Sequence, residues 1–218
     1  MGQKMYRYIL FDFDGTVFDT VEGIARSVRY ALNKVGLDAP EETLRCFAGP
    51  PLADIYLEKF GGTAEDAARF IADFRERYQP TGLFECRIFP GVTDLLGELR
   101  AAGRSTAVAT LKPLHLAETL LAREGIGDLF DAVCGGGDEG HEGTKADIVA
   151  RAMARLGALP EETVLVGDTK YDIIGAHECG VAAVGVGYGY AAPGELAAAG
   201  ADVIVPDMPA LRAWLLEN

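Results

Sequence analysis

The stretch Tyr8-Ile9-Leu10-Phe11-Asp12-Phe13-Asp14-Gly15-Thr16 decides the fold of this chain. Its first four residues form a continuous apolar run, which is typical of a strand buried on both faces of a parallel sheet. The run leads directly into Asp12 and Asp14. In open α/β sheets, ligands bind outside the carboxyl ends of the strands. The two aspartates therefore predict a functional site at that edge of a sheet.

Short apolar runs recur along the rest of the chain, at residues 106–109, 132–134, 164–166, 182–186 and 203–205. Between them, apolar residues with helical spacing precede Gly103, Gly125 and Gly157, which are typical helix stops. Strands that alternate with helices indicate βαβ units. We therefore expect an α/β fold, with a doubly wound, Rossmann-like parallel sheet as its core and helices on both faces.

The stretch from about Thr20 to Phe84 breaks this alternation. It contains two apolar stripes with helical spacing, one over residues 21–35 and one over residues 67–78, and no convincing strand. The simplest interpretation is a helical insertion after the first strand. We expect an α-helical cap domain at 19–83, inserted into a core domain that comprises 1–18 and 84–218.

Composition narrows the range of functions. The chain has 218 residues and a formal net charge of −13, which argues against a general partner of nucleic-acid polymers or anionic membranes. No signal peptide and no apolar run of the ~20 residues that a membrane span needs is apparent, which predicts a cytoplasmic protein. Four widely spaced cysteines without a CxxC pair predict buried thiols in a reducing compartment. The sequence gives no indication of an oligomeric state.

A third aspartate, Asp168, ends the apolar run at 164–166 and should lie at the same sheet edge as Asp12 and Asp14. Three hard oxygen donors at one edge suit Mg²⁺. Asp172 is a further candidate ligand, directly or through water, or a residue that orients one. An alternative role for Asp168 is a helix N-cap, although a cap would not explain why three acids converge.

Basic and hydroxyl side chains follow two other runs. Thr110 could donate to a phosphate oxygen, helped by the backbone N–H of Leu111, or could be a turn residue. Lys112 could reach a substrate, or could be a solvated surface lysine. Lys145 begins a predicted helix, where the helix dipole disfavours a cation. A phosphate beside an acidic cluster would explain Lys145, and a surface lysine is the alternative.

Together these segments resemble the four motifs of the haloacid dehalogenase superfamily, over essentially the whole chain. The motifs are Asp12-Phe13-Asp14-Gly15-Thr16, Thr110, Lys145, and Gly167-Asp168 with Asp172. The helical insertion resembles the small α-helical cap of the phosphoglycolate phosphatase-like branch. Within it, Phe47-Ala48-Gly49-Pro50-Pro51-Leu52 resembles a cap loop that faces the substrate.

The resemblance implies a Mg²⁺-dependent phosphomonoester hydrolase that acts on a small phosphorylated metabolite through an aspartyl-phosphate. Asp12 would attack phosphorus, and Asp14 would protonate the leaving alcohol and later activate water. The Asp12 carboxylate, the Asp14 main-chain oxygen and Asp168 would hold the metal. The phosphoryl oxygens would be held by Thr110, Lys145 and backbone amides near Gly15. The cap would close over the site and read the leaving group.

The substrate and the exact chemistry stay open at this point. Phosphoglycolate is the usual substrate of this branch, but residues 21–32 and 49–52 look more like relatives that act on nucleoside 5′-monophosphates. The candidates for contacting the leaving group are Arg26, Arg45, Gly49 and Lys112. A β-phosphoglucomutase-type mutase, a phosphonatase or a catalytically silent binding protein on the same fold are the alternatives.

Overall fold

A computed structural model describes residues 5–137 and 143–218. The chain divides into two compact units. One comprises the residues up to Val17 together with Ile88–Asn218, and the other is Phe18–Arg87. The expected boundaries at 18/19 and 83/84 lie close to the ends of these units. That the second unit acts as a cap stays a prediction.

The first unit contains a six-stranded sheet in the order β5-β4-β1-β6-β7-β8, in which neighbouring strands are parallel. Its strands are β1 (Tyr8–Phe11), β4 (Ser105–Pro113), β5 (Ala132–Gly136), β6 (Thr163–Gly167), β7 (Ala182–Val186) and β8 (Val203–Val205). β1 lies between β4 and β6, with Phe11 beside Val108 and Val166. The predicted parallel α/β sheet is confirmed, and each predicted run lies in a strand.

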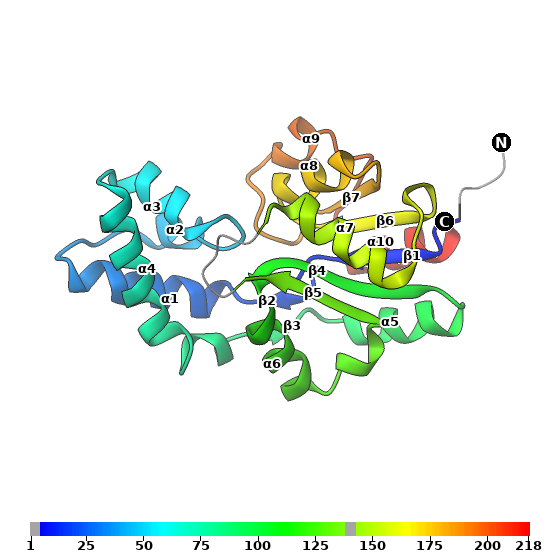
Figure 1. Cartoon of the computed structure of the whole chain (residues 1–218), viewed down its shortest axis with the longest axis horizontal. Coiled ribbons are helices and arrows are strands. Elements are labelled where there is room, and N and C mark those ends of the chain that lie inside the picture. The colour runs from blue at the N-terminus through cyan, green and yellow to red at the C-terminus, as the bar shows by residue number, and fades with distance from the viewer. Residues whose placement is uncertain (1–4, 138–142) are drawn as a thin grey trace. The chain divides into compact units, whose positions relative to one another are not determined.

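Helices cover both faces of this sheet, with α7 and α8 on one side and α5 and α6 on the other (Figure 1). The helices of this unit are α5 (Val92–Ala101), α6 (Leu114–Glu124), α7 (Lys145–Leu156), α8 (Lys170–Glu178), α9 (Glu195–Ala198) and α10 (Met208–Glu217). Two 3₁₀ turns, at Gly127–Leu129 and Pro160–Glu162, precede β5 and β6.

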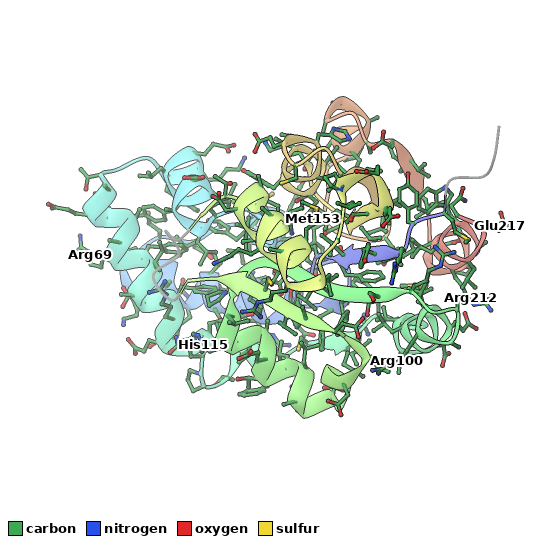
Figure 2. The ribbon with its side chains drawn as sticks, turned by 45° about the vertical axis from the view of Figure 1, so that its right-hand side comes forward. Arg69, Arg100, His115, Met153, Arg212 and Glu217 are labelled. Carbon is green, nitrogen blue, oxygen red and sulfur yellow. The ribbon has the colours of Figure 1, made fainter. Side chains whose placement is uncertain are left out.

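Side chains from alternate strand positions pack under these helices. Leu10 and Leu165 lie against Ile148 of α7 in one buried cluster, and Met153 of the same helix, labelled in Figure 2, packs partly buried against it. Residues on both faces of β1 and β6 are buried, which explains why these strands read as continuous apolar runs. Arg212 of α10, also labelled in Figure 2, donates to Glu98 of α5 at 2.5 and 2.7 Å.

β4 is longer than the sequence predicts. We expected it to end at Thr110, but it continues to Pro113, which pairs with Gly136 of β5 after a register shift. A Cβ on Gly135 would lie 2.6 Å from the Leu114 Cα. Because Gly135 and Gly136 have no side chains, the backbones of β4 and β5 can approach closely enough for β4 to extend to Pro113.

The second unit is mainly helical, as predicted. Its elements are β2 (Phe18–Asp19), α1 (Val21–Lys34), α2 (Glu41–Arg45), α3 (Leu52–Phe60), α4 (Ala64–Tyr78), the 3₁₀ turn Gly82–Phe84, and β3 (Arg87–Ile88), which pairs with β2. Val28 of α1 and Phe70 of α4 lie on the buried stripes. Val35 was expected on the first stripe but follows α1 and is 39% exposed. Between residues 20 and 84, all described, the structure has no strand.

Two sequence expectations concern the cell compartment. Among the described residues, no helix is both long and apolar enough to cross a bilayer. All four cysteines lie in the described ranges and none forms a disulfide, but only Cys134 is fully buried. Cys46, the residue directly after the short helix α2, is exposed, and Cys86 and Cys179 are partly buried. The expectation of four buried thiols is therefore wrong.

Candidate active site

Asp12 occupies the first position after β1. Its backbone N–H donates to the Val166 carbonyl oxygen at 2.8 Å, which continues the pairing of β1 with β6 by one residue. Its side chain is buried and its Oδ1 lies 2.5 Å from the Lys145 Nζ. A strand that is paired on both sides thus delivers this carboxylate to the carboxyl edge of the sheet, where the sequence predicted a site.

Lys145 is the first residue of α7 and is also buried, with a side chain that is 4% exposed. Its ammonium lies 2.5 Å from Asp12 Oδ1 and 2.6 Å from Asp172 Oδ1. Gly175 of α8 makes room for it, because a Cβ there would lie 2.7 Å from the Lys145 Cβ. The surface-lysine alternative is therefore wrong, and two carboxylates compensate for the unfavourable helix dipole.

Asp172, the third residue of α8, makes contacts through both of its carboxylate oxygens. One oxygen accepts from the N–H and the hydroxyl of Thr169 at 2.9 and 2.8 Å, which caps the helix, and the other faces Lys145. Because Thr169 is the N-cap residue, the alternative role of Asp168 as a cap is wrong. The cap fixes the rotamer of Asp172 and so fixes where Lys145 can lie.

Asp168 follows β6 and is fully buried. The Thr16 hydroxyl donates to its Oδ1 at 3.1 Å, and the Tyr190 backbone N–H donates to its Oδ2 at 2.8 Å. Two glycines pack closely against Asp168. A Cβ on Gly15 would lie 2.1 Å from the Asp168 Oδ2, and a Cβ on Gly189 would lie 2.2 Å from the Asp168 Cβ. The orientation of this carboxylate is therefore set from both sides.

Asp12, Asp168 and Asp172 each offer a carboxylate oxygen, and these oxygens lie within 4.8 Å of one another. Buried carboxylates packed this closely repel one another unless cations or protons compensate. Lys145 supplies one cation, and the remaining charge and the hard oxygen donors fit a divalent ion such as Mg²⁺. The Asp14 carboxylate is not part of this group. Its main-chain oxygen stays a predicted ligand.

The electrostatics of the cluster are visible in its pKa values. Burial, with the neighbouring charge of Asp172, raises the pKa of Asp12 from 3.8 to about 7, although Lys145 opposes the rise. Burial, with Asp172 and Asp12, also raises the pKa of Asp168 well above its usual range. Burial alone would lower the pKa of Lys145, but its two carboxylate partners raise it, so the amine stays charged. The site is short of positive charge.

Thr110 and Lys112 lie on the extension of β4. Thr110 is buried, and its hydroxyl accepts a hydrogen bond from the Lys112 N–H at 3.2 Å, while Leu111 is partly buried beside them. The Lys112 side chain is 3% exposed and its Nζ lies 3.0 Å from Asp14 Oδ1. The surface-lysine alternative is wrong for Lys112 too. A phosphate contact through Thr110 and Leu111 stays a prediction.

The candidate leaving-group contacts in the helical unit stay predictions. Arg26 is exposed and donates to Glu85 at 2.9 Å. Arg45 is exposed at the end of α2. Gly49 has a φ of 103°, a conformation that favours glycine in the loop before α3.

The sequence reasoning missed the loop after β7. Tyr188 donates from its hydroxyl to the Thr16 main-chain oxygen at 3.1 Å, and its ring lies 4.9 Å from the Phe89 ring. Gly189 and Tyr190 contact Asp168, as described above. The detectable signal was the alternation Gly187-Tyr188-Gly189-Tyr190 after a strand that ends at the same edge. It was overlooked because the loop acts through a backbone N–H and a missing side chain rather than through acids.

Comparison with known proteins identifies the family. A model described as haloacid dehalogenase-like hydrolase matches residues 9–186. The chain is 36% identical over 211 residues to a 5′-nucleotidase of Pseudomonas aeruginosa, with 96% of each chain covered. It is 32% identical over 193 residues to a phosphoglycolate phosphatase of Yersinia pestis, covering 86% of this chain and 83% of that protein.

Two further matches concern a differently named relative and a solved structure. The chain is 38% identical over 183 residues to the tyrosine-protein kinase PtkA of Mycobacterium tuberculosis, but covers only 62% of that protein. A crystal structure of a predicted phosphatase from Clostridium acetobutylicum matches with a TM-score of 0.93 and 35% identity, covering 98% of this chain and all of that one. The names of these relatives differ in substrate, so the comparisons identify a family and not a substrate.

Proposed function

The chain belongs to the haloacid dehalogenase-like hydrolases and is a phosphatase, and we propose that it hydrolyses phosphomonoesters with Mg²⁺ and with Asp12 as the nucleophile. One observation carries this proposal. Asp12 is a buried carboxylate that contacts Lys145 and shares its site with Asp168 and Asp172 at the carboxyl edge of the sheet. Such a cluster attracts a metal ion and a phosphoryl group together, because each offsets the charge of the other.

In the proposed first step, a carboxylate oxygen of Asp12 forms a bond to phosphorus while the bond from phosphorus to the ester oxygen breaks. Asp14 gives its proton to that oxygen, which leaves as the alcohol. In the second step, water gives a proton to Asp14 and its oxygen bonds to phosphorus. The bond between phosphorus and Asp12 then breaks, which releases phosphate and restores both aspartates.

The other residues bind and orient. Lys145 neutralises the Asp12 carboxylate in the resting site, and we propose that it shifts part of this interaction to the phosphoryl oxygens. Thr110, the amide of Leu111 and amides near Gly15 would donate to those oxygens. Asp12, Asp168 and the Asp14 main-chain oxygen would hold Mg²⁺, with Asp172 orienting Lys145. The metal would supply the positive charge that phosphoryl transfer requires.

We propose a nucleoside 5′-monophosphate as the substrate rather than phosphoglycolate. Two observations support this choice. The relative named 5′-nucleotidase is 36% identical along nearly the whole chain, whereas the phosphoglycolate phosphatase is 32% identical over a shorter stretch. The sequence of α1 and of the loop before α3 also resembles nucleotidases.

The test is phosphate release from 4-nitrophenyl phosphate and from a panel of natural phosphomonoesters, with Mg²⁺ and with EDTA. Asp12→Asn keeps the shape of the side chain and serves as the control. We expect turnover that requires metal, is absent from the variant, and is fastest with a nucleotide. A strong preference for phosphoglycolate would contradict the proposed substrate. A folded protein that releases phosphate from no ester would contradict the proposed reaction and would point to a mutase, a phosphonatase or a binding protein.

A further inference from the structure

Asp12 and Asp14 are two residues apart, yet each is paired with a different lysine. Asp12 contacts Lys145, whereas both oxygens of Asp14 face Lys112, at 3.0 and 3.3 Å from its Nζ. The Lys112 side chain is 3% exposed and the Asp14 side chain 15%. Asp14 is thus accessible enough to meet a substrate, and the lysine behind it is almost completely buried.

The backbone of Lys112 is held firmly. Its N–H donates to the Thr110 hydroxyl, and its carbonyl oxygen would lie 2.8 Å from a Cβ on Gly135, so β5 packs directly against it. Its ammonium also lies 5.8 Å from the centre of the Phe13 ring, within cation–π range. The strand extension, the glycine of β5 and the aromatic ring therefore fix the position of the ammonium.

Placing a charged lysine in this interior has a large cost in desolvation and in side-chain entropy. Small apolar side chains fill the buried positions 107–109 of β4, and the polar Thr110 carries no charge, so Lys112 is the one charged residue of this strand. A buried contact between a lysine and a carboxyl group is a weak source of stability but a strong constraint on geometry, because both partners must keep their positions to keep their hydrogen bonds. The constrained partner here is the aspartate that has to reach the leaving oxygen.

We propose that Lys112 is a positioning residue that holds the Asp14 carboxyl group in the orientation for proton transfer to the leaving oxygen. The inference rests on the proposed role of Asp14 as acid and base. It differs from the sequence-based expectation that Lys112 contacts the leaving group itself. A general acid works only when its oxygen lies within hydrogen-bond distance of the atom that it protonates. A lysine that holds the carboxyl group therefore controls the step without contacting the substrate.

The leaving group provides the test. Release of 4-nitrophenolate needs little help from an acid, whereas release of an alcohol from an alkyl phosphate such as a nucleoside 5′-monophosphate needs it fully. The quantity to measure is the pre-steady-state rate of release for each ester, because this rate isolates formation of the phosphoenzyme from its hydrolysis. Asp14→Asn is the reference and should slow alkyl release far more than aryl release.

We expect Lys112→Met to reproduce this pattern, with alkyl release slowed by ~10²-fold and aryl release by only a few-fold. Lys112→Arg should restore part of the alkyl rate, because a guanidinium can still donate to Asp14, and Lys112→Gln provides a second test if the methionine variant does not fold. Lys34→Met, which removes an exposed lysine paired with Glu76, is the matched control and should change neither rate.

Equal slowing of both esters would overturn the inference, as would a raised KM with an unchanged release rate, which would indicate direct substrate contact. If Asp14→Asn itself shows no dependence on the leaving group, the proposed function fails. If Asp14→Asn shows the dependence and the Lys112 variants do not, only the positioning role fails.

Discussion

The hydroxyl of Tyr188 donates to the main-chain oxygen of Thr16 at 3.1 Å, and the side chain of Thr16 in turn donates to Asp168. The loop after β7 is thus joined to the loop after β1 across the acid that is proposed to bind metal. Burial, and then the charge of Asp168, raise the pKa of Tyr188, so its hydroxyl remains a donor.

Replacing Tyr188 with Phe should test this connection. The ring can still pack on Phe89, so the loss is one hydrogen bond, worth about 1 kcal/mol of unfolding free energy. Because Thr16 would then orient Asp168 less well, we also expect weaker Mg²⁺ binding, measured as a smaller rise in melting temperature on titration with Mg²⁺. Tyr30→Phe, which removes a hydroxyl bonded to Glu76 in the helical unit, should leave the Mg²⁺ effect unchanged. An unaltered Mg²⁺ response in Tyr188→Phe would show that Asp168 is oriented without this contact.

Gly189→Ala should impair the metal site by a purely steric route. The added Cβ would lie 2.2 Å from the Asp168 Cβ, so either the loop or the carboxylate must move. We expect Mg²⁺-dependent phosphatase activity to fall by ~10²-fold or more, as measured by kcat/KM at several Mg²⁺ concentrations.

The matched control for that variant is Gly97→Ala in α5. A Cβ on Gly97 meets nothing within 4 Å, and alanine is the better helix former by about 1 kcal/mol. This variant should be more stable and equally active. Equal activity in Gly189→Ala would contradict the close packing against Asp168.

Lys145→Met should destabilise the protein in a pH-dependent manner. Removing one partner from a buried ion pair costs about 3–5 kcal/mol, since Asp12 and Asp172 would then face each other without the ammonium. The carboxyl groups can avoid this cost by taking up a proton, so the loss should be smaller near pH 5.5 than near pH 8. Urea unfolding of the metal-free proteins at both pH values measures the difference. A loss that is the same at both would mean that Lys145 stabilises the fold only by packing.

The raised pKa of Asp12 predicts competition between protons and metal. Between its unfolded value of 3.8 and its folded value of about 7, the folded protein binds more protons than the unfolded chain. This group therefore makes the metal-free protein less stable as the pH rises through that window. Mg²⁺ requires the ionised carboxylate, so it should raise the melting temperature more at about pH 8 than at about pH 6.

Asp12→Asn should make the stabilisation by Mg²⁺ depend less on pH, because an amide does not titrate near neutral pH. The measurement is a series of thermal unfolding curves with and without Mg²⁺ across the pH range. If the rise in melting temperature that Mg²⁺ causes in the wild-type protein were the same at every pH, competition between protons and Mg²⁺ at Asp12 would be contradicted.

Much of the fold could be predicted from the order of the residues alone. The apolar runs and the glycine stops predicted every strand of the large sheet, and the stripes over residues 21–35 and 67–78 predicted the helical unit. These signals are local, because a strand buried on both faces must be apolar along its length and a helix must repeat its apolar side chains with its own period. An aspartate directly after a strand is a local signal too, which is why Asp12 and Asp168 were found.

The contacts that organise the site could not be predicted in this way. The sequence suggested that the side chains of Asp12, Asp14 and Asp168 would converge, with Asp172 as a further candidate. The structure pairs the Asp14 side chain with Lys112, and the cluster consists of Asp12, Asp168 and Asp172. From the sequence alone, Lys112 and Lys145 could equally have been surface residues.

The sequence by itself therefore determined the elements of the fold and the chemical types of residue at one sheet edge. The tertiary structure alone decided which of these residues meet. The reason is physical: the partners come from segments far apart in the chain, and their distances depend on strand register and on close packing at glycines such as Gly175 and Gly189. Neither quantity is encoded within any short stretch of sequence.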